Sequence, residues 1–217
     1  MDTNNLIDAT IDFVKETLKG AEGGHDWWHI YRVWKSAINI NKEEKAIDLV
    51  VQLGALLHDI ADSKFHDGDE TVGSETARLF LEEQQVEAQT IIQVIDIIEN
   101  ISFKGGFGQS ENMSLELMVV QDADRLDAIG AIGIARAFNY GGFKNRTLHD
   151  PTIEPVNYRD KEAYKKSDAP TINHFYEKLL LLKDKMNTNS GRQLAAERHK
   201  FMELYLEQFY AEWEGSL

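Results

Sequence analysis

The stretch Leu53-Gly54-Ala55-Leu56-Leu57-His58-Asp59 ends an apolar run directly in a histidine and an acid. Apolar residues cover most of the circumference of residues 45–59, which predicts a buried central helix. Adjacent helix residues point in different directions, so His58 and Asp59 reach one centre most easily near a helix end. An imidazole beside a carboxylate suits a divalent metal ion. An isolated His-Asp pair also fits a plain helix cap, so a metal site requires further ligands from elsewhere in the chain.

The amino-acid composition limits the bonds that the chain can form and the partners that it can bind. The chain has no cysteine, so disulfides and thiolate metal sites are excluded. Its formal net charge of -14 disfavours a nucleic-acid polymer as partner, because such binding needs Lys and Arg to neutralise phosphates. A small anionic substrate remains compatible with this charge if a divalent cation and a few basic side chains bind it.

We expect a cytoplasmic protein without a membrane partner. No apolar run approaches the roughly 18 residues that span a bilayer, and residues 1–20 mix acids with apolar residues, unlike a signal peptide. With 217 residues, the chain is expected to form a single domain over 1–217. Its core would lie at about 24–139, followed by a loop excursion at 140–170 and C-terminal helices at 171–214.

Helical spacing of apolar residues predicts an all-α fold, and we find no convincing strand or internal repeat. Residues 143–170 hold all three prolines and show no sustained period. They are either a surface loop or a segment that covers a substrate. The predicted helices span residues 6–18, 26–40 with Asp26 as cap, 45–59, 75–84, 88–98, 115–138, 172–186 and 193–213.

Two residues could complete the site. His29 lies near a predicted helix start with Val33 one turn later, so it can point toward the core. Asp124 follows the apolar pair Val119-Val120 on a predicted buried helix. A buried carboxylate needs a partner, and a metal ion would be one.

The order His29, His58-Asp59 and Asp124 resembles the H…HD…D signature of the HD-domain phosphohydrolase superfamily, an all-α family that hydrolyses phosphate esters and anhydrides at a divalent metal. The flanking sequence is similar to small stand-alone bacterial members, some of which are nucleoside triphosphate pyrophosphohydrolases. The resemblance covers roughly residues 24–213. It rests on four segments: Gly24-His25-Asp26-Trp27-Trp28-His29-Ile30-Tyr31-Arg32-Val33, His58-Asp59-Ile60-Ala61-Asp62-Ser63-Lys64, Asp122-Ala123-Asp124-Arg125-Leu126-Asp127-Ala128-Ile129-Gly130 and Asn173-His174-Phe175-Tyr176-Glu177-Lys178-Leu179-Leu180.

The resemblance implies that His29, His58, Asp59 and Asp124 are the metal ligands, held between the helices of one bundle. Asp122 and Asp127 would support the last ligand or cap a helix. Two-metal relatives carry an adjacent His-His pair and a further histidine, whereas only His66 lies in that interval here. One divalent ion is therefore expected, with Mn²⁺ first and Mg²⁺, Co²⁺, Ni²⁺, Fe²⁺ or Zn²⁺ as alternatives.

Catalytic roles are expected for Asp62, Lys64 and Arg125. Asp62 either orients the attacking water or caps a helix end. Lys64 and Arg125 flank the expected centre and would bind phosphate oxygens. His25 either contacts substrate or supports His29.

Other candidates have alternative explanations. Lys104, Lys144 and Arg146 could bind phosphate from loops, and His174 has apolar neighbours that favour core packing. Several aromatic side chains could stack on a base but equally suit a core or an interface. These are Trp27, Trp28, Tyr31, Phe103 and Phe107.

The leading hypothesis is a metal-dependent enzyme that splits (deoxy)nucleoside triphosphates into monophosphate and pyrophosphate through a metal-activated water. A nucleoside monophosphate phosphatase is the alternative within the same class. A non-catalytic sensor of metal and nucleotide, or an all-α scaffold with a vestigial site, would use the same residues without turnover. The sequence leaves open the base, the physiological metal and whether the protein is a homodimer.

Overall fold

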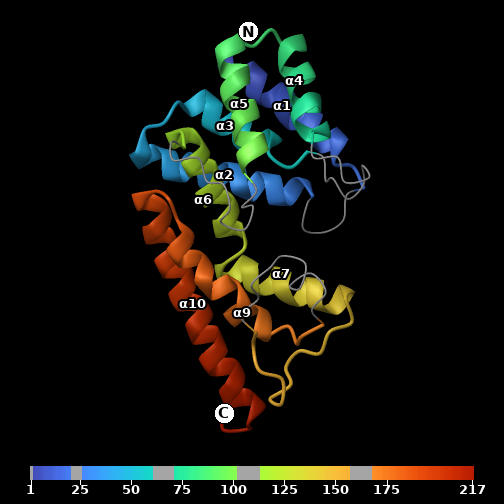
Figure 1. Ribbon diagram of the computed structural model, residues 1–217, viewed down its shortest axis with the longest axis vertical. Helices are drawn as coiled ribbons and strands as arrows, with labels where there is room; N and C mark the ends of the chain where they lie inside the picture. The colour runs from blue at the N-terminus through green and yellow to red at the C-terminus, as the bar shows by residue number, and fades with distance from the viewer. Residues whose placement is uncertain (1, 21–25, 61–70, 102–112, 157–167) are drawn as a thin grey trace. The chain divides into compact units, whose positions relative to one another are not determined.

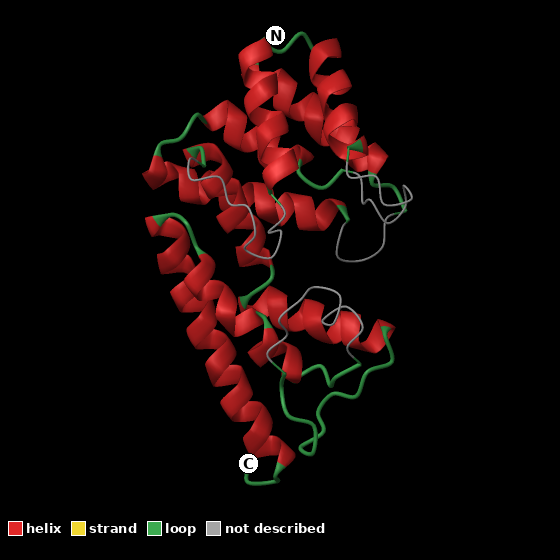
Figure 2. Ribbon diagram, viewed as in Figure 1, coloured by secondary structure: helices red, strands yellow, loops and turns green. Residues whose placement is uncertain are grey.

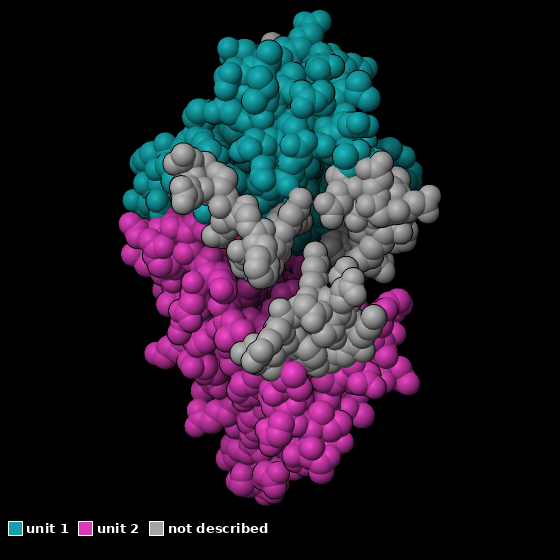
Figure 3. Space-filling view, viewed as in Figure 1, with its two compact units in different colours: residues 1–124 teal, residues 125–217 magenta. Residues whose placement is uncertain are grey.

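The computed structural model describes residues 2–20, 26–60, 71–101, 113–156 and 168–217. These residues form helices and no strand (Figures 1 and 2), which confirms the predicted all-α class. None of the described helices is long and apolar enough to cross a membrane. The chain divides into two compact units, Met1–Asp124 and Arg125–Leu217, which are coloured separately in Figure 3.

Helix α3 (Asp48–Leu57) is the centre of unit 1. It packs against α1 (Thr3–Thr17), α2 (Trp27–Glu44) and α5 (Ala88–Asn100), and α4 (Val72–Glu83) covers α5. Residues 50–57 of α3 are buried apart from Gln52, because apolar side chains face all three neighbours. At Gly54, an added Cβ would lie 2.7 Å from Ile97 Cδ1, so this glycine allows α3 and α5 to approach closely.

The turn between α2 and α3 is built around the buried side chain of Asn41. Its Nδ2 donates to the carbonyl of Ala46 at 3.2 Å, and its Oδ1 accepts from the N–H of Ala46 at 2.8 Å. Lys45 has φ 61° and ends α2. The prediction of one helix over 45–59 was therefore wrong at its start, because the side chain of Asn41 replaces the bonds that a continuing helix would make.

Helix α6 (Leu115–Asp127) begins in unit 1, and the unit boundary falls within it. Its Glu116 Oε1 accepts from the N–H of Ile47 at 2.9 Å, which satisfies a donor at the start of α3. Gln121 Nε2 donates to the carbonyl of Asn100 at the end of α5, at 2.8 Å. These two bonds fix the register of α6 against α3 and α5, and so the position of Asp124.

Unit 2 packs α7 (Gly130–Phe143) against α10 (Asn189–Trp213), with the short α9 (Asn173–Glu177) and the 3₁₀ helix η2 (Leu179–Lys185) beside them. The aromatic rings of Phe138, Phe175, Tyr205 and Phe209 contact one another between these helices, and the contacting pairs have centroids 5.9–6.5 Å apart.

Two boundaries in unit 2 differ from the predictions. The single helix expected at 172–186 is interrupted at Lys178, whose φ and ψ of -146° and -56° are not helical. The last helix begins at Asn189 rather than at 193, because Thr188 Oγ1 caps it by accepting from the N–H of Gly191 at 2.9 Å.

The predicted helix over 115–138 was wrong, since α6 ends at Asp127 and α7 begins at Gly130. Gly130 has φ 75°, a conformation that a side chain disfavours. A Cβ on Gly133 would lie 2.2 Å from the carbonyl oxygen of Ala128, so the chain turns back against its own backbone there. The small residues of this segment therefore allow a break between two helices, and they also allow close packing.

This packing predicts that Gly133→Ala destabilises the protein by about 2 kcal/mol or more, because backbone must move to admit the methyl group. Gly142→Ala is the matched control in the same helix, where an added Cβ meets no atom within 4 Å. It should be neutral or stabilising by up to about 1 kcal/mol, since alanine favours helix. Urea unfolding measures both, and equal midpoints for the two variants would contradict the packing described.

Candidate metal centre

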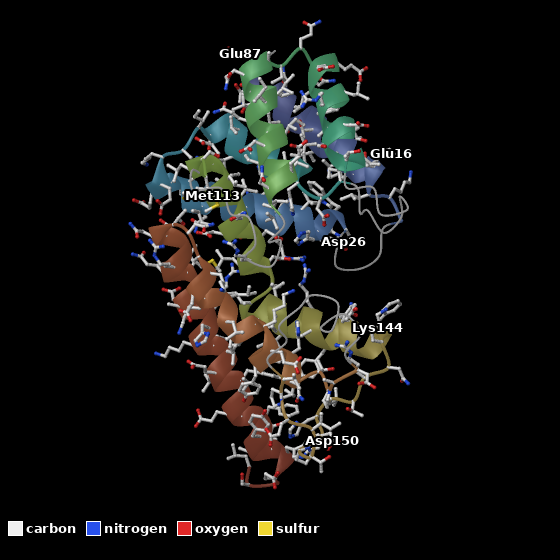
Figure 4. The ribbon with its side chains drawn as sticks, viewed as in Figure 1. Glu16, Asp26, Glu87, Met113, Lys144 and Asp150 are labelled. Carbon is white, nitrogen blue, oxygen red and sulfur yellow. The ribbon has the colours of Figure 1, made fainter. Side chains whose placement is uncertain are left out.

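His29 is placed by the N-terminal cap of α2. Asp26, which Figure 4 labels, accepts from the N–H of His29 through Oδ1 at 3.0 Å. This confirms Asp26 as the predicted cap and fixes His29 as the third helical residue. His29 is 3% exposed, so its imidazole points into the unit rather than into solvent.

His58 follows the last residue of α3, where the final carbonyls of a helix lack intrahelical partners. Its Nδ1 lies 2.9 Å from the carbonyl oxygen of Ala55. A carbonyl can only accept, so Nδ1 donates in this contact, and Nε2 is the ring nitrogen that is directed toward His29. The helix cap that the sequence offered as the alternative to a metal site is therefore present as well, because Nδ1 makes it while Nε2 faces His29.

The two imidazoles and Asp124 converge. The distance from His29 Nε2 to His58 Nε2 is 3.3 Å, and Asp124 Oδ1 lies 3.5 Å from the first nitrogen and 3.9 Å from the second. A point equally far from these three atoms lies about 2.1 Å from each, which matches metal–nitrogen and metal–oxygen bonds of roughly 2.0–2.2 Å. The donor set and its spacing therefore fit one divalent ion.

Asp59 belongs to the same cluster. One nitrogen of His29, one of His58 and a carboxylate oxygen of Asp59 all lie within 4.8 Å of one another. The carboxylate of Asp124 is 39% exposed, whereas the two histidine side chains are 3–4% exposed. The two histidines are therefore shielded from solvent, whereas solvent reaches the centre at the carboxylate of Asp124.

The other predicted site residues have different surroundings. Arg125 is buried, and its Nη1 donates to the backbone carbonyl of Lys185 at 2.8 Å. Asp122 is fully buried, and Asp127 forms an ion pair with Arg136 in unit 2. His25, Asp62, Lys64 and His66, like Phe103, Lys104 and Phe107, lie outside the described residues.

His174 is a further titratable group, on α9 in unit 2. Burial lowers the pKa of its imidazole to about 4, with smaller contributions from the positive charges of Lys178 and Arg146. The neighbouring Phe175 is fully buried, as expected for packing in the core.

Three comparisons relate the chain to known proteins. The HD domain family matches residues 27–129, a range that contains all four candidate ligands. The chain is 38% identical over 211 residues to YpgQ of Bacillus subtilis, covering 94% of this chain and 91% of YpgQ. An HD-superfamily hydrolase from Bacillus thuringiensis has 45% identity and a TM-score of 0.79, covering 98% of both chains. The crystal structure of YpgQ in complex with ADP has a TM-score of 0.75 at 34% identity, covering 98% of this chain and 97% of that one.

The ligand geometry predicts that Asp124→Asn lowers Mn²⁺ affinity by at least about 100-fold, because the amide carries no charge to offset the ion. Asp96→Asn is the control, since Asp96 is exposed on α5 and bonds only Asn100 among the contacts described for its carboxylate. Calorimetric titration of metal-free protein with Mn²⁺ measures both. Unchanged affinity in Asp124→Asn would remove this residue from the centre.

The low pKa of His174 predicts a pH-dependent part of the stability. The imidazole is neutral in the fold and binds its proton more readily when unfolded, so its contribution is complete above pH 6.5. It declines as the pH falls from 6.5 to about 4, by roughly 3 kcal/mol. In urea unfolding of metal-free protein, His174→Gln should flatten the slope of stability against pH in this range. A slope identical to wild type would contradict the assignment.

Proposed function

The chain belongs to the HD superfamily of metal-dependent phosphohydrolases, and we propose that its substrates are nucleoside triphosphates or deoxynucleoside triphosphates. The products would be a nucleoside monophosphate and pyrophosphate. The observation that carries the proposal is the triangle of His29 Nε2, His58 Nε2 and Asp124 Oδ1, whose edges are 3.3, 3.5 and 3.9 Å.

The nucleotide part of the proposal draws on the relative YpgQ, whose structure was solved in complex with ADP. A related chain that binds a nucleoside diphosphate has room for a base, a sugar and a phosphate chain. The overall charge of -14 makes local positive charge necessary for such an anion. A divalent ion at the candidate centre, for which we propose Mn²⁺, would provide part of that charge.

The side chains of the centre each have a defined task. His58 presents Nε2 because Ala55 holds its Nδ1–H, and His29 is held by the capped first turn of α2. Both rings are buried, which keeps water away from the nitrogens. The half-exposed carboxylate of Asp124 leaves the substrate side accessible. When bound, the divalent ion would supply Lewis acidity that lowers the pKa of a water and offsets phosphate charge.

Proton transfer and phosphate binding are assigned as proposals. Asp62 would orient the water or take its proton, three residues after the ligand Asp59. Lys64 and Arg125 would donate to phosphate oxygens, with His25 at the substrate. One donor of Arg125 is already used by the carbonyl of Lys185, which positions the guanidinium.

The test is a panel of ribo- and deoxyribonucleoside mono-, di- and triphosphates with Mn²⁺, with products separated by chromatography. We expect monophosphate and pyrophosphate from triphosphates, and a loss of about 100-fold or more in kcat/KM for Asp59→Ala, because a ligand is gone. Asp96→Asn is the matched surface control and should retain wild-type turnover.

The products discriminate between the alternatives. Orthophosphate released from monophosphates without added pyrophosphatase would identify a monophosphate phosphatase instead. Binding of Mn²⁺ and nucleotide without turnover of any compound would identify a sensor. Equal activity in wild type and Asp59→Ala would refute the assignment of the site.

A further inference from the structure

The long helix α10 has one buried side and one side with large apolar residues in solvent. Ala195, Met202 and Leu206 are buried where α10 packs against α7 and η2 (Figure 1). Phe201 and Leu204 point to a different side of the helix and are 48% and 60% exposed. Large apolar side chains that gather in solvent are typical of an interface between proteins.

A hollow beside Phe201 extends this apolar surface onto α7. It has a volume of about 340 Å³ and is lined by residues 129–132 at the start of α7 and by Glu197, Arg198 and Phe201 of α10. Ile132 is itself 42% exposed. All of these residues belong to unit 2, so the surface requires no contribution from unit 1.

The exposed side of α10 has the residue spacing of a helix that packs against another helix. Intervals of three and four residues alternate along it, at Leu194, Glu197, Phe201, Leu204 and Gln208. This spacing places the five residues in one stripe, which we call the α10 stripe. If two copies of α10 run antiparallel about a two-fold axis near residues 202–203, Phe201 of each copy meets Leu204 of the other. In the same register, Glu197 meets Gln208, and every contact occurs twice.

Two charged residues beside the stripe are complementary in this register. Lys200 and Glu207 are both exposed and lie seven residues apart, which is about two turns, on the same side of α10. The helix rise separates them by about 10 Å, so they are too far apart to pair within one chain. In the antiparallel register, Lys200 of each copy lies opposite Glu207 of the other copy. Charges at these flanking positions set the orientation of paired helices.

The overall charge of the chain makes this complementarity important. A formal net charge of -14 opposes the association of two identical chains. Opposite charges placed across the contact offset that repulsion locally and favour one orientation over others. The surface of α10 is therefore suited to a second copy of the same chain, both in its apolar centre and in its charged flank.

We propose that the α10 stripe is the interface of a homodimer, in which α10 packs antiparallel against α10 of a second copy of this chain. Phe201 and Leu204 form its apolar centre, and the pairs of Lys200 with Glu207 set its direction. The hollow beside Phe201 gives room for side chains of the second copy. This assembly requires neither metal nor nucleotide, so the inference is independent of the proposed function.

Sedimentation equilibrium of the full-length protein tests the interface. We expect the wild type to be a dimer at concentrations up to about 100 µM. Leu204→Glu should raise the dissociation constant at least about 30-fold, because it places a charge in the apolar centre. Leu79→Glu is the matched control, since Leu79 lies on α4 outside the stripe and is 67% exposed, and it should stay within about twofold of wild type. A monomeric wild type, or a dimer that Leu204→Glu leaves intact, overturns the proposal.

A charge-reversal cycle tests the antiparallel direction. Lys200→Glu and Glu207→Lys each place like charges opposite one another at two symmetric positions, and each should weaken the dimer about tenfold. An effect of net charge alone would act in opposite directions in these two variants. Lys42→Glu is the control, because it makes the same change of charge at an exposed position on α2, and it should stay within about twofold of wild type.

The double variant Lys200→Glu/Glu207→Lys decides the register. It restores opposite charges across the interface, so its dissociation constant should return to within about threefold of wild type. Recovery in the double variant supports the antiparallel pair of helices. Two weakened single variants without recovery in the double variant, or single variants that match the wild type, overturn it. These four residues changed for the test are all exposed, so the result does not depend on a substitution in the core.

Discussion

The candidate metal centre depends on the convergence of two buried imidazole nitrogens and one carboxylate oxygen within 3.9 Å of one another. Because Nδ1 of His58 donates to the carbonyl of Ala55, its Nε2 faces Nε2 of His29 at 3.3 Å. Such an arrangement requires positive charge or a shared proton among the three groups. A divalent ion supplies more positive charge than a proton does, so the arrangement of these three groups favours a metal ion.

Buried polar side chains keep these three groups in place. Asn41 closes the turn before α3, Glu116 accepts a bond from its first turn, and Gln121 ties α6 to the end of α5. Each of them satisfies backbone groups that a helix end leaves open. Apolar packing alone would allow α6 to slide along its neighbours, whereas these directional bonds set the height at which Asp124 meets the histidines.

Unit 2 is stabilised by other kinds of interaction than unit 1. Aromatic rings from α7, α9 and α10 pack against one another, and the guanidinium of Arg146 lies over the ring of Tyr140 near the end of α7. Its acids are partly committed inside the unit, since Asp127 pairs with Arg136 and also acts on Arg198.

The sequence by itself determined the all-α class and the apolar wall of α3, because helical periodicity and burial follow directly from residue type. It also predicted that His29, His58, Asp59 and Asp124 form one ligand set. All four lie in unit 1 of the structure. Only the tertiary structure decided that α2 ends before Lys45, that α7 begins at Gly130 and that α9 ends before Lys178. At the first two boundaries the side chain of Asn41 bonds the backbone of Ala46, and Gly133 lies against the carbonyl of Ala128, contacts that no local pattern encodes. The direction of Arg125 toward Lys185 was equally undetermined, because a long side chain takes the partner that folding brings within reach.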